Sequence, residues 1–332
     1  MDYAREKQVA IEAVTLAARL CAAVQAEMTQ PGALEKGDRS PVTVADFGSQ
    51  ALVCRHLAAA FPADPIVAEE DSAQLQRPEN ADRLGQVLYY VQQTHAFASP
   101  DDVCRWIDAG NGPVSPRFWT LDPIDGTKGF LRREQYAIAL ALIERRQVQV
   151  AALACPNLPL DLDEPAGAAG VIFVAVRGQG AAMARLGSSD FAPIRAASAG
   201  DRLRFVESVE SGHGDQPLQK AIAAAAGITA PSLRMDSQAK YGVLARGDAA
   251  LYLRLPSPKQ PDYREKIWDH AAGSLIIEEA GGRVSDMHGR PLDLASGPQM
   301  ANNRGVIASS GDIHTAVLAA IRTQETSTDK NE

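Results

Sequence analysis

The strongest constraint on the fold is a regular alternation of strand-like and helix-like segments that begins near residue 200. The apolar runs "LRFVES", "PSLRMDS" and "AALYLRL" are separated by segments that predict helices over 215–226 and 237–246. A further helix is predicted to start at Asp269, in "WDHAAGSLIIEEAGG", and to stop at the Gly-Gly pair. Alternation of this kind is typical of an α/β domain. A chain of 332 residues has room for a second domain in front of it.

The residues before this region predict two helices followed by two strand pairs. An apolar stripe that includes Ile11, Val14 and Cys21 predicts the first helix. Asp46 is expected to be the N-cap of the second helix, which ends before Pro62. The stretch "YAIALALIERRQVQVAALACP" has the pattern of a β-hairpin, and "VIFVAVRGQGAAMARL" that of a second strand pair.

The connection between the second helix and the hairpin predicts little regular structure. Residues 72–90 are expected to form a surface helix, and residues 91–118 a loop punctuated by glycine and proline. We therefore expect an α+β domain over residues 1–160 and an α/β domain over 161–322, followed by a disordered tail over 323–332.

The bulk composition favours a cytoplasmic globular protein. A formal charge of −8 argues against binding to a nucleic-acid polymer, and no apolar run is expected to reach membrane-spanning length. The charged start "MDYAREKQVA" lacks a signal-peptide pattern. The cysteines form no CxxC pair and are expected to be reduced, mostly buried thiols: Cys21, Cys54, Cys104 and Cys155. We expect a monomer.

Acidic residues end four separated segments, at Asp46, at Glu69, at the pair Asp122 and Asp125, and at Asp269. Taken singly, such residues are most often helix caps or solvated loop residues. The stretch "DPIDGT" is more demanding, because two carboxylates so close repel each other unless one is protonated or a cation lies between them.

The other residues of "DPIDGT" suit a metal and a phosphate. Ile124 can offer its carbonyl oxygen, Gly126 permits close approach of another group, and Thr127 supplies an N–H and a hydroxyl. Oxygen ligands in this arrangement suit Mg²⁺, and exposed N–H groups just beyond them suit a phosphate. The pattern indicates a phosphoryl-transfer centre.

The chain resembles the 3'(2'),5'-bisphosphate nucleotidases, a branch of the lithium-sensitive inositol monophosphatase-like superfamily. The resemblance covers about residues 8–320. It is carried in order by "SPVTVAD", "IVAEEDS", "WTLDPIDGTKGFLR", "CPNLP", "SVESGH", "DSQAKY", "LYLRLP" and "KIWDHAAG" with "EEAGG". "DPIDGT" with "WDHAAG" is characteristic of the superfamily, whereas "TKGFLR", "SVESGH" and "DSQAKY" point to the nucleotidase branch.

The resemblance implies a layered αβαβα sandwich with the active site between its two halves. It also implies two or three Mg²⁺ ions and inhibition by Li⁺. The implied metal ligands are Glu69, Asp122, the Ile124 carbonyl, Asp125 and Asp269. Asp46 and Thr127 would orient and deprotonate the attacking water. The implied substrate-binding residues are Gly126, Thr127, His213, Ser237, Lys240, Arg254 and Asp269.

The substrate-selecting residues have simpler interpretations as well. His213 fits a loop histidine, and Lys240 fits a surface charge, although its spacing from Ser237 also permits joint phosphate contact. Arg254 lies inside an apolar run, which favours a bound anion or a buried carboxylate partner. Two features depart from the family pattern: Arg133 stands where a glycine is expected, and the segment 70–121 is short.

The leading hypothesis is a Mg²⁺-dependent phosphatase that removes the 3'-phosphate of 3'-phosphoadenosine 5'-phosphate to give AMP, with the sulfated form as a second candidate substrate. An inositol phosphate or sugar phosphatase on the same scaffold is the first alternative, and a non-catalytic nucleotide or metal sensor is the second. A haloacid-dehalogenase mechanism fits less well, because it needs DxD spacing.

Overall fold

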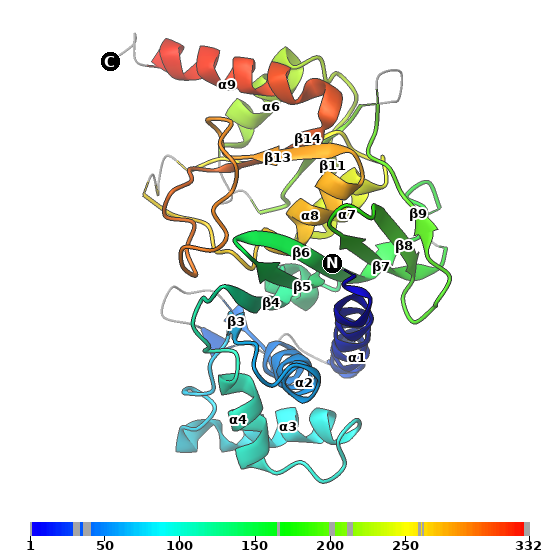
Figure 1. Ribbon diagram of the computed structural model, residues 1–332, viewed down its shortest axis with the longest axis vertical. Coiled ribbons are helices and arrows are strands. Elements are labelled where there is room, and N and C mark those ends of the chain that lie inside the picture. The colour runs from blue at the N-terminus through cyan, green and yellow to red at the C-terminus, as the bar shows by residue number, and fades with distance from the viewer. Residues whose placement is uncertain are drawn as a thin grey trace.

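The fold is a stack of five layers in the order α, β, α, β, α (Figure 1). A computed structural model describes residues 2–28, 34–35, 41–164, 167–198, 203–210, 215–257, 260 and 262–328. The two outer layers are helical, and two sheets enclose a central pair of helices. This is the layered sandwich that the resemblance implies.

The first sheet has seven strands, and its spatial order is the same as their order in the chain. The strands β3 and β4 are parallel, and each later strand is antiparallel to its neighbour. The bounds are β3 (Ile66–Ala68), β4 (Arg117–Asp125), β5 (Ala137–Glu144), β6 (Gln147–Pro159), β7 (Ala169–Val176), β8 (Ala181–Arg185) and β9 (Ala192–Pro193).

The second sheet has five strands in the order β11, β10, β12, β14, β13. Its strand β10 is parallel to both neighbours, whereas β14 is antiparallel to both of its own. The bounds are β10 (Phe205–Glu207), β11 (Leu233–Arg234), β12 (Leu251–Arg254), β13 (Gly282–Ser285) and β14 (Val306–Ser310).

Helices cover both sheets. The first sheet packs on one face against α1 (Ala4–Glu27) and α2 (Val44–Ala60), which also pack against each other, and on the other face against α7 (Ala239–Ala245) and α8 (Ala271–Glu279). The outer face of the second sheet carries α6 (Gln216–Ala225) and α9 (His314–Thr328). The remaining elements are β1 (Leu34–Glu35), β2 (Pro41–Val42), α3 (Ala81–Gln92), α4 (Pro100–Asp108), α5 (Thr127–Leu131), and two 3₁₀ turns, Pro78–Asn80 and Gly311–Ile313.

Alternating side chains of the first sheet divide the core. On β5, Ile138 and Leu140 face the cluster around α1 and α2, whereas Ala139 and Ala141 face the cluster around α7 and α8. A third apolar cluster lies between the second sheet and the helices α6 and α9. Because both faces of β5 are buried, its sequence reads as an almost unbroken apolar run.

Several predicted elements are confirmed, and others need correction. Both strand pairs and the order of strands and helices after residue 200 are as predicted. The loop expected over 91–118 contains α4, whose start Ser99 forms a capping box with Asp102. The first sheet runs through β9, so the boundary predicted at residue 160 falls inside it. Residues 323–328, expected to be disordered, continue α9.

Helix α1 corrects the statement that no segment reaches membrane-spanning length. By length and composition alone it could cross a membrane. One such helix is weak evidence, because a core helix of a soluble protein passes the same test. Here α1 packs against α2 and β6, and its side chains Ala13, Val14 and Ala17 are fully buried.

Glycine is required in the central layer where α8 meets α7. A Cβ atom added to Gly273 would lie 2.3 Å from the ring of Tyr241, which is itself fully buried. We expect Gly273→Ala to lower the free energy of unfolding by about 1–3 kcal/mol, the cost typical of an overfilled core. The measurement is urea denaturation.

Gly85 provides the matched control, because it lies in α3 and an added Cβ would meet nothing within 4 Å. Gly85→Ala is expected to stabilise the protein by up to about 1 kcal/mol through helix propensity alone. Equal effects of the two substitutions would contradict the packing argument.

Candidate active site

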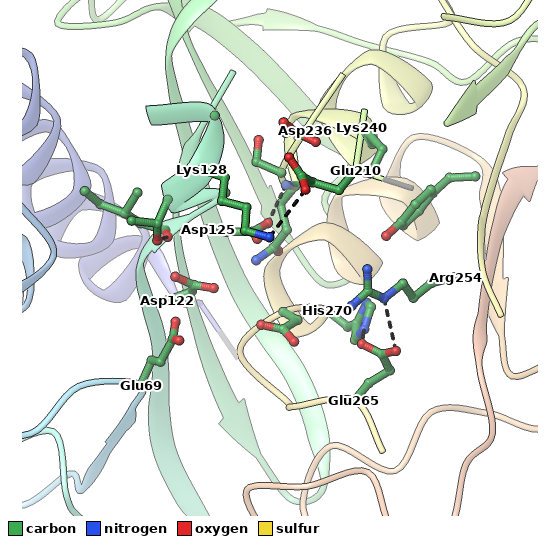
Figure 2. Close-up of a pocket in the computed structure, with 18 of the residues that line it drawn as sticks. Glu69, Asp122, Asp125, Lys128, Glu210, Asp236, Lys240, Arg254, Glu265 and His270 are labelled. Atoms are coloured by element: carbon green, nitrogen blue, oxygen red, sulfur yellow. Dashed lines mark hydrogen bonds and ion pairs between the residues drawn. The ribbon is translucent and has the colours of Figure 1, made fainter. Parts of the chain in front are cut away.

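A cavity of about 420 Å³ lies where the end of strand β4 faces the segment that leads into α8. Carboxylates and basic side chains gather on its walls, and Figure 2 shows Glu69 and Asp122 on one side with Arg254, Glu265 and His270 on the other. The predicted site residues that line this cavity are Glu69, Asp122, Ile124, Asp125, Gly126, Thr127, Ser237, Lys240, Arg254 and Asp269.

The charge of the cavity wall is strongly unbalanced. In the part of the chain that the structure describes, seven acidic residues line it against three basic ones, which are Lys128, Lys240 and Arg254. Burial raises the pKa of Asp125, and Glu69 adds to the effect, while Lys240 and Arg254 oppose it. Burial also raises the pKa of Asp269 well above its ordinary value, with further contributions from Asp125 and Glu265. These carboxylates therefore favour a proton or a cation between them.

The stretch "DPIDGT" is the end of strand β4 rather than a free turn. Asp122 pairs with Ala139 of β5 and Asp125 with Ala137, so a bulge separates the two acids. Gly126 then takes a left-handed conformation with φ of 87°, and α5 starts at Thr127. At the bulge, successive side chains no longer alternate regularly between the two faces of the sheet. Both carboxylates and Ile124 can therefore line the same cavity.

Asp46 lies behind Thr127 and outside the cavity wall. It is the third residue of α2, not its N-cap as predicted, because Thr43 is the cap. One carboxylate oxygen, Oδ2, accepts from Thr43 N at 2.7 Å and from Thr43 Oγ1 at 2.5 Å. The other oxygen, Oδ1, accepts from the Thr127 hydroxyl at 3.2 Å. Asp46 therefore combines a helix-capping role with a contact that leads to the cavity.

The basic side of the cavity begins at Ser237 and Lys240. Ser237 precedes α7, with φ of 66°, so it is not on the helix as predicted. Lys240 is only 4% exposed, which excludes the interpretation as a surface charge. Burial lowers the pKa of Lys240 to about 8, against the opposing effect of Asp125 and Asp236. Its ammonium lies 5.2 Å from the Tyr252 ring centre.

Arg254 has the buried carboxylate partner that its apolar surroundings suggested. Its Nε donates to Oε1 of Glu265 at 3.1 Å, and Glu265 is 8% exposed. The His270 Nε2 atom lies 3.3 Å from the other oxygen, Oε2. Glu265 was not predicted from the sequence, and only its position four residues before Asp269 could have drawn attention to it.

A second group of ion pairs was also missed. Arg132 contacts Glu134, Glu210 and Asp236, and Lys128 donates to Glu210 at 3.3 Å. These contacts join α5 to the segments after β10 and β11 at the cavity edge.

Three further predictions have mixed outcomes. Asp269 lies two residues before α8, whose N-cap is His270, so the predicted helix start is wrong by two residues. His213 lies outside the described residues. Arg133, expected to be glycine in relatives, has φ of 60°, a conformation that glycine adopts at lower cost. Its guanidinium donates to the Met28 carbonyl at 2.8 Å.

The cavity suits a hard divalent cation by the chemistry of its donors. Among the described residues carboxylates outnumber basic groups, and burial, followed by the crowding of like charges, raises the pKa values of Asp125 and Asp269. Within the described residues, the compact set of three ligand groups is Glu265, Asp269 and His270, whose donor atoms lie within 4.8 Å of one another. That set shares Asp269 with the predicted ligands and otherwise differs from them.

Comparison with known proteins identifies the family. The model of the inositol monophosphatase family matches residues 5–326. The chain belongs to the inositol monophosphatase family. The curated 3'(2'),5'-bisphosphate nucleotidase of Schizosaccharomyces pombe is 46% identical, covering 96% of both chains. Its counterpart from Oryza sativa is 43% identical over 96% of this chain and 94% of its own, which puts this chain in the nucleotidase branch.

Solved structures agree on the fold. The IMPase of Thermotoga maritima matches with a TM-score of 0.61 and 20% identity, covering 94% of this chain and 95% of its own. Mycobacterium tuberculosis SuhB matches with a TM-score of 0.60 and 21% identity, covering 97% of both chains. Both therefore share the inositol monophosphatase fold with this chain.

Gly126 is the point where the two halves of the site touch. A Cβ atom there would lie 2.8 Å from Cβ of Ser237, and its φ of 87° adds backbone strain for any other residue. We expect Gly126→Ala to lower the free energy of unfolding by more than the roughly 1 kcal/mol that positive φ alone costs. Urea denaturation and phosphate release measure the two effects.

Gly178 provides a control that separates the cost of backbone strain from the cost of the contact with Ser237. Its φ is 76°, and an added Cβ would meet nothing within 4 Å. Gly178→Ala should show the strain alone, with activity retained. If both variants lose the same stability and both stay active, the contact between Gly126 and Ser237 is unimportant.

Proposed function

We propose that the protein hydrolyses the 3'-phosphate of 3'-phosphoadenosine 5'-phosphate to give AMP and phosphate, and that it also accepts the sulfated form. The observation that carries the proposal is the pairing of a carboxylate-rich wall with buried basic residues in one cavity. The curated relatives support the substrate class, because they are named 3'(2'),5'-bisphosphate nucleotidases and align with this chain over nearly their whole length.

Mg²⁺ is the proposed cofactor, as two or three ions. Its proposed ligands are Glu69, Asp122, the Ile124 carbonyl, Asp125 and Asp269. When bound, the metal would neutralise phosphate charge and make a nearby water more acidic.

Asp46 and Thr127 are the proposed pair that handles the proton of the attacking water. The Thr127 hydroxyl lines the cavity, and it donates to Asp46 Oδ1. Asp46 is buried behind this hydroxyl and would reach the water through it. Thr127 thus orients the water, and Asp46 fixes the direction of the hydroxyl and holds the proton.

The basic residues distinguish this proposal from an inositol monophosphate phosphatase. A second phosphate needs counter-charge beyond the metal ligands. Lys240 and Arg254 line the wall away from Glu69 and Asp122 and can supply it. Ser237 can add a hydrogen bond, and His213, outside the described residues, is proposed as a further contact. A sensor without catalysis is the less favoured proposal, because binding alone needs no group that takes a proton, and Asp46 hydrogen-bonded to Thr127 supplies one.

The protein is further proposed to act as a cytoplasmic monomer on small molecules, without a nucleic-acid polymer or membrane partner. The acidic net charge and the free cysteines support this, since Cys21, Cys54 and Cys155 are buried as thiols.

Phosphate release from a substrate panel tests the proposal. With Mg²⁺, the bisphosphate nucleotide should have a higher kcat/KM than inositol monophosphate or an inositol bisphosphate, and chelation of the metal should abolish release. Li⁺ in the same assay should inhibit, because a monovalent ion in a Mg²⁺ position supplies less charge stabilisation. Equal or better turnover of inositol monophosphate would reject the substrate assignment, and insensitivity to high-millimolar Li⁺ would reject the proposed inhibition.

The Asp46 assignment is tested by Asp46→Asn and Thr127→Val. Each should lower kcat by about 100-fold or more, the usual contribution of acid–base groups, and leave nucleotide binding measurable by calorimetry. Ser99→Ala is the control, because it removes the cap of α4, which has the same kind of capping box, at a cost of about 1 kcal/mol without changing a hydrogen bond of Asp46. Undiminished turnover of Asp46→Asn would refute the assignment.

A further inference from the structure

Arg254 needs a fixed orientation to bind an anion selectively. Its side chain extends from the end of β12 and is 19% exposed at the cavity. Among the described residues, its hydrogen-bond acceptor is Glu265, and the bond uses Nε alone. A guanidinium has five N–H donors in a rigid plane, so the two terminal nitrogens stay available when Nε is held.

Glu265 is itself held by a chain of buried groups. Its Oε2 lies 3.3 Å from His270 Nε2, and His270 Nδ1 lies 2.7 Å from the Tyr241 hydroxyl. His270 is 2% exposed and Tyr241 is fully buried. The chain therefore runs from Tyr241 in the middle helical layer to a side chain on the cavity wall, and Figure 2 shows its cavity end, from His270 through Glu265 to Arg254.

The direction of each hydrogen bond follows from the donors available. Burial would raise the pKa of Glu265, but Arg254 and His270 lower it to about 2, so the group is a carboxylate that only accepts. His270 Nε2 must then carry a proton. In the neutral imidazole Nδ1 accepts from the Tyr241 hydroxyl, and every member of the chain is satisfied.

We propose that Glu265 is a positioning residue, which holds the guanidinium of Arg254 so that its terminal N–H groups face the substrate phosphate that is not hydrolysed. This inference rests on the proposed function. Without the carboxylate, Arg254 would keep its charge, but its side chain would be mobile and would lose conformational freedom when the phosphate binds. His270 Nε2 would also lose its hydrogen-bond acceptor. Glu265 would then contribute to discrimination between bisphosphate and monophosphate substrates.

A metal role for Glu265 is the competing interpretation, because its donor atoms lie close to those of Asp269 and His270. Two observations favour the positioning role. Both carboxylate oxygens already have partners within the protein. One of those partners is the cation Arg254, which would repel a divalent ion at the same oxygens.

The test compares substrates that differ only in the second phosphate. In Glu265→Gln, KM for 3'-phosphoadenosine 5'-phosphate should rise about 10- to 100-fold, as expected for the loss of a charge-assisted contact, with kcat nearly unchanged. KM for adenosine 3'-monophosphate and the Mg²⁺ concentration for half-maximal activity should not change. Calorimetry in the Asp46→Asn background should show the same selective loss of binding, without turnover.

Two further variants accompany it. Glu265→Asp keeps the negative charge, but its shorter side chain cannot reach both Arg254 and His270. Its KM for the bisphosphate nucleotide should therefore lie between the values of the unaltered protein and of Glu265→Gln. It replaces Glu265→Gln in the test if that variant does not fold. Glu278→Gln is the matched control, because Glu278 pairs with Arg177 at 3.0 Å at the far end of α8.

Each remaining outcome has a definite meaning. A raised Mg²⁺ requirement would overturn the inference in favour of a metal ligand. Equal losses for both substrates, or no change in KM, would also overturn it and leave the proposed function standing. Failure of the unaltered protein to release phosphate from the bisphosphate nucleotide would overturn the proposed function together with the inference.

Discussion

The rest of the structure has to offset one unfavourable interaction, the free-energy cost of placing several carboxylates close together in a partly buried cavity. Among the described residues, seven acidic residues line the cavity against three basic ones, and burial, reinforced by repulsion from neighbouring carboxylates, raises the pKa values of Asp125 and Asp269. A chain that maximised stability alone would separate these groups. Their retention in one cavity indicates that the repulsion is relieved by a bound cation, and that apolar packing elsewhere supplies the stability the cavity lacks.

The layered fold makes such a cavity possible because each half supplies part of it. The first sheet delivers Asp122 and Asp125 at the bulged end of β4, and the helical layer between the sheets delivers Asp269 just before α8. The halves meet at a backbone contact, where Gln238 N donates to Asp125 Oδ2, and at the close approach of Gly126 to Ser237. A shift of either sheet would therefore alter the spacing of the carboxylates.

Local patterns predicted most strands and helices and the acidic ends of four segments, whereas the layered order and the roles of the site residues followed from the family resemblance. Strand runs, the "DPIDGT" spacing and the acids at segment ends are all visible in the chain. The predicted N-cap role of Asp46 was wrong, because Thr43, three residues earlier, also suits an N-cap and the helix starts directly after it, which puts Asp46 at the N3 position. Glu265 could not be predicted, since its partners Arg254 and His270 identify it only once the tertiary fold brings β12 next to the start of α8. His213 lies outside the described residues, so its role stays a prediction.

Two buried carboxylates each hold a cavity-lining side chain with one oxygen and a residue of the surrounding fold with the other. Asp46 uses one oxygen to cap α2 and the other to hold Thr127. Glu265 uses one oxygen for Arg254 and the other for His270, which contacts the packed Tyr241. In both cases the cavity-facing group is oriented by a carboxylate that does not depend on solvent, so its geometry is set before any ligand arrives. Orientation fixed in advance lowers the entropy lost on binding, and this explains why charge is buried here, where apolar residues would give more stability.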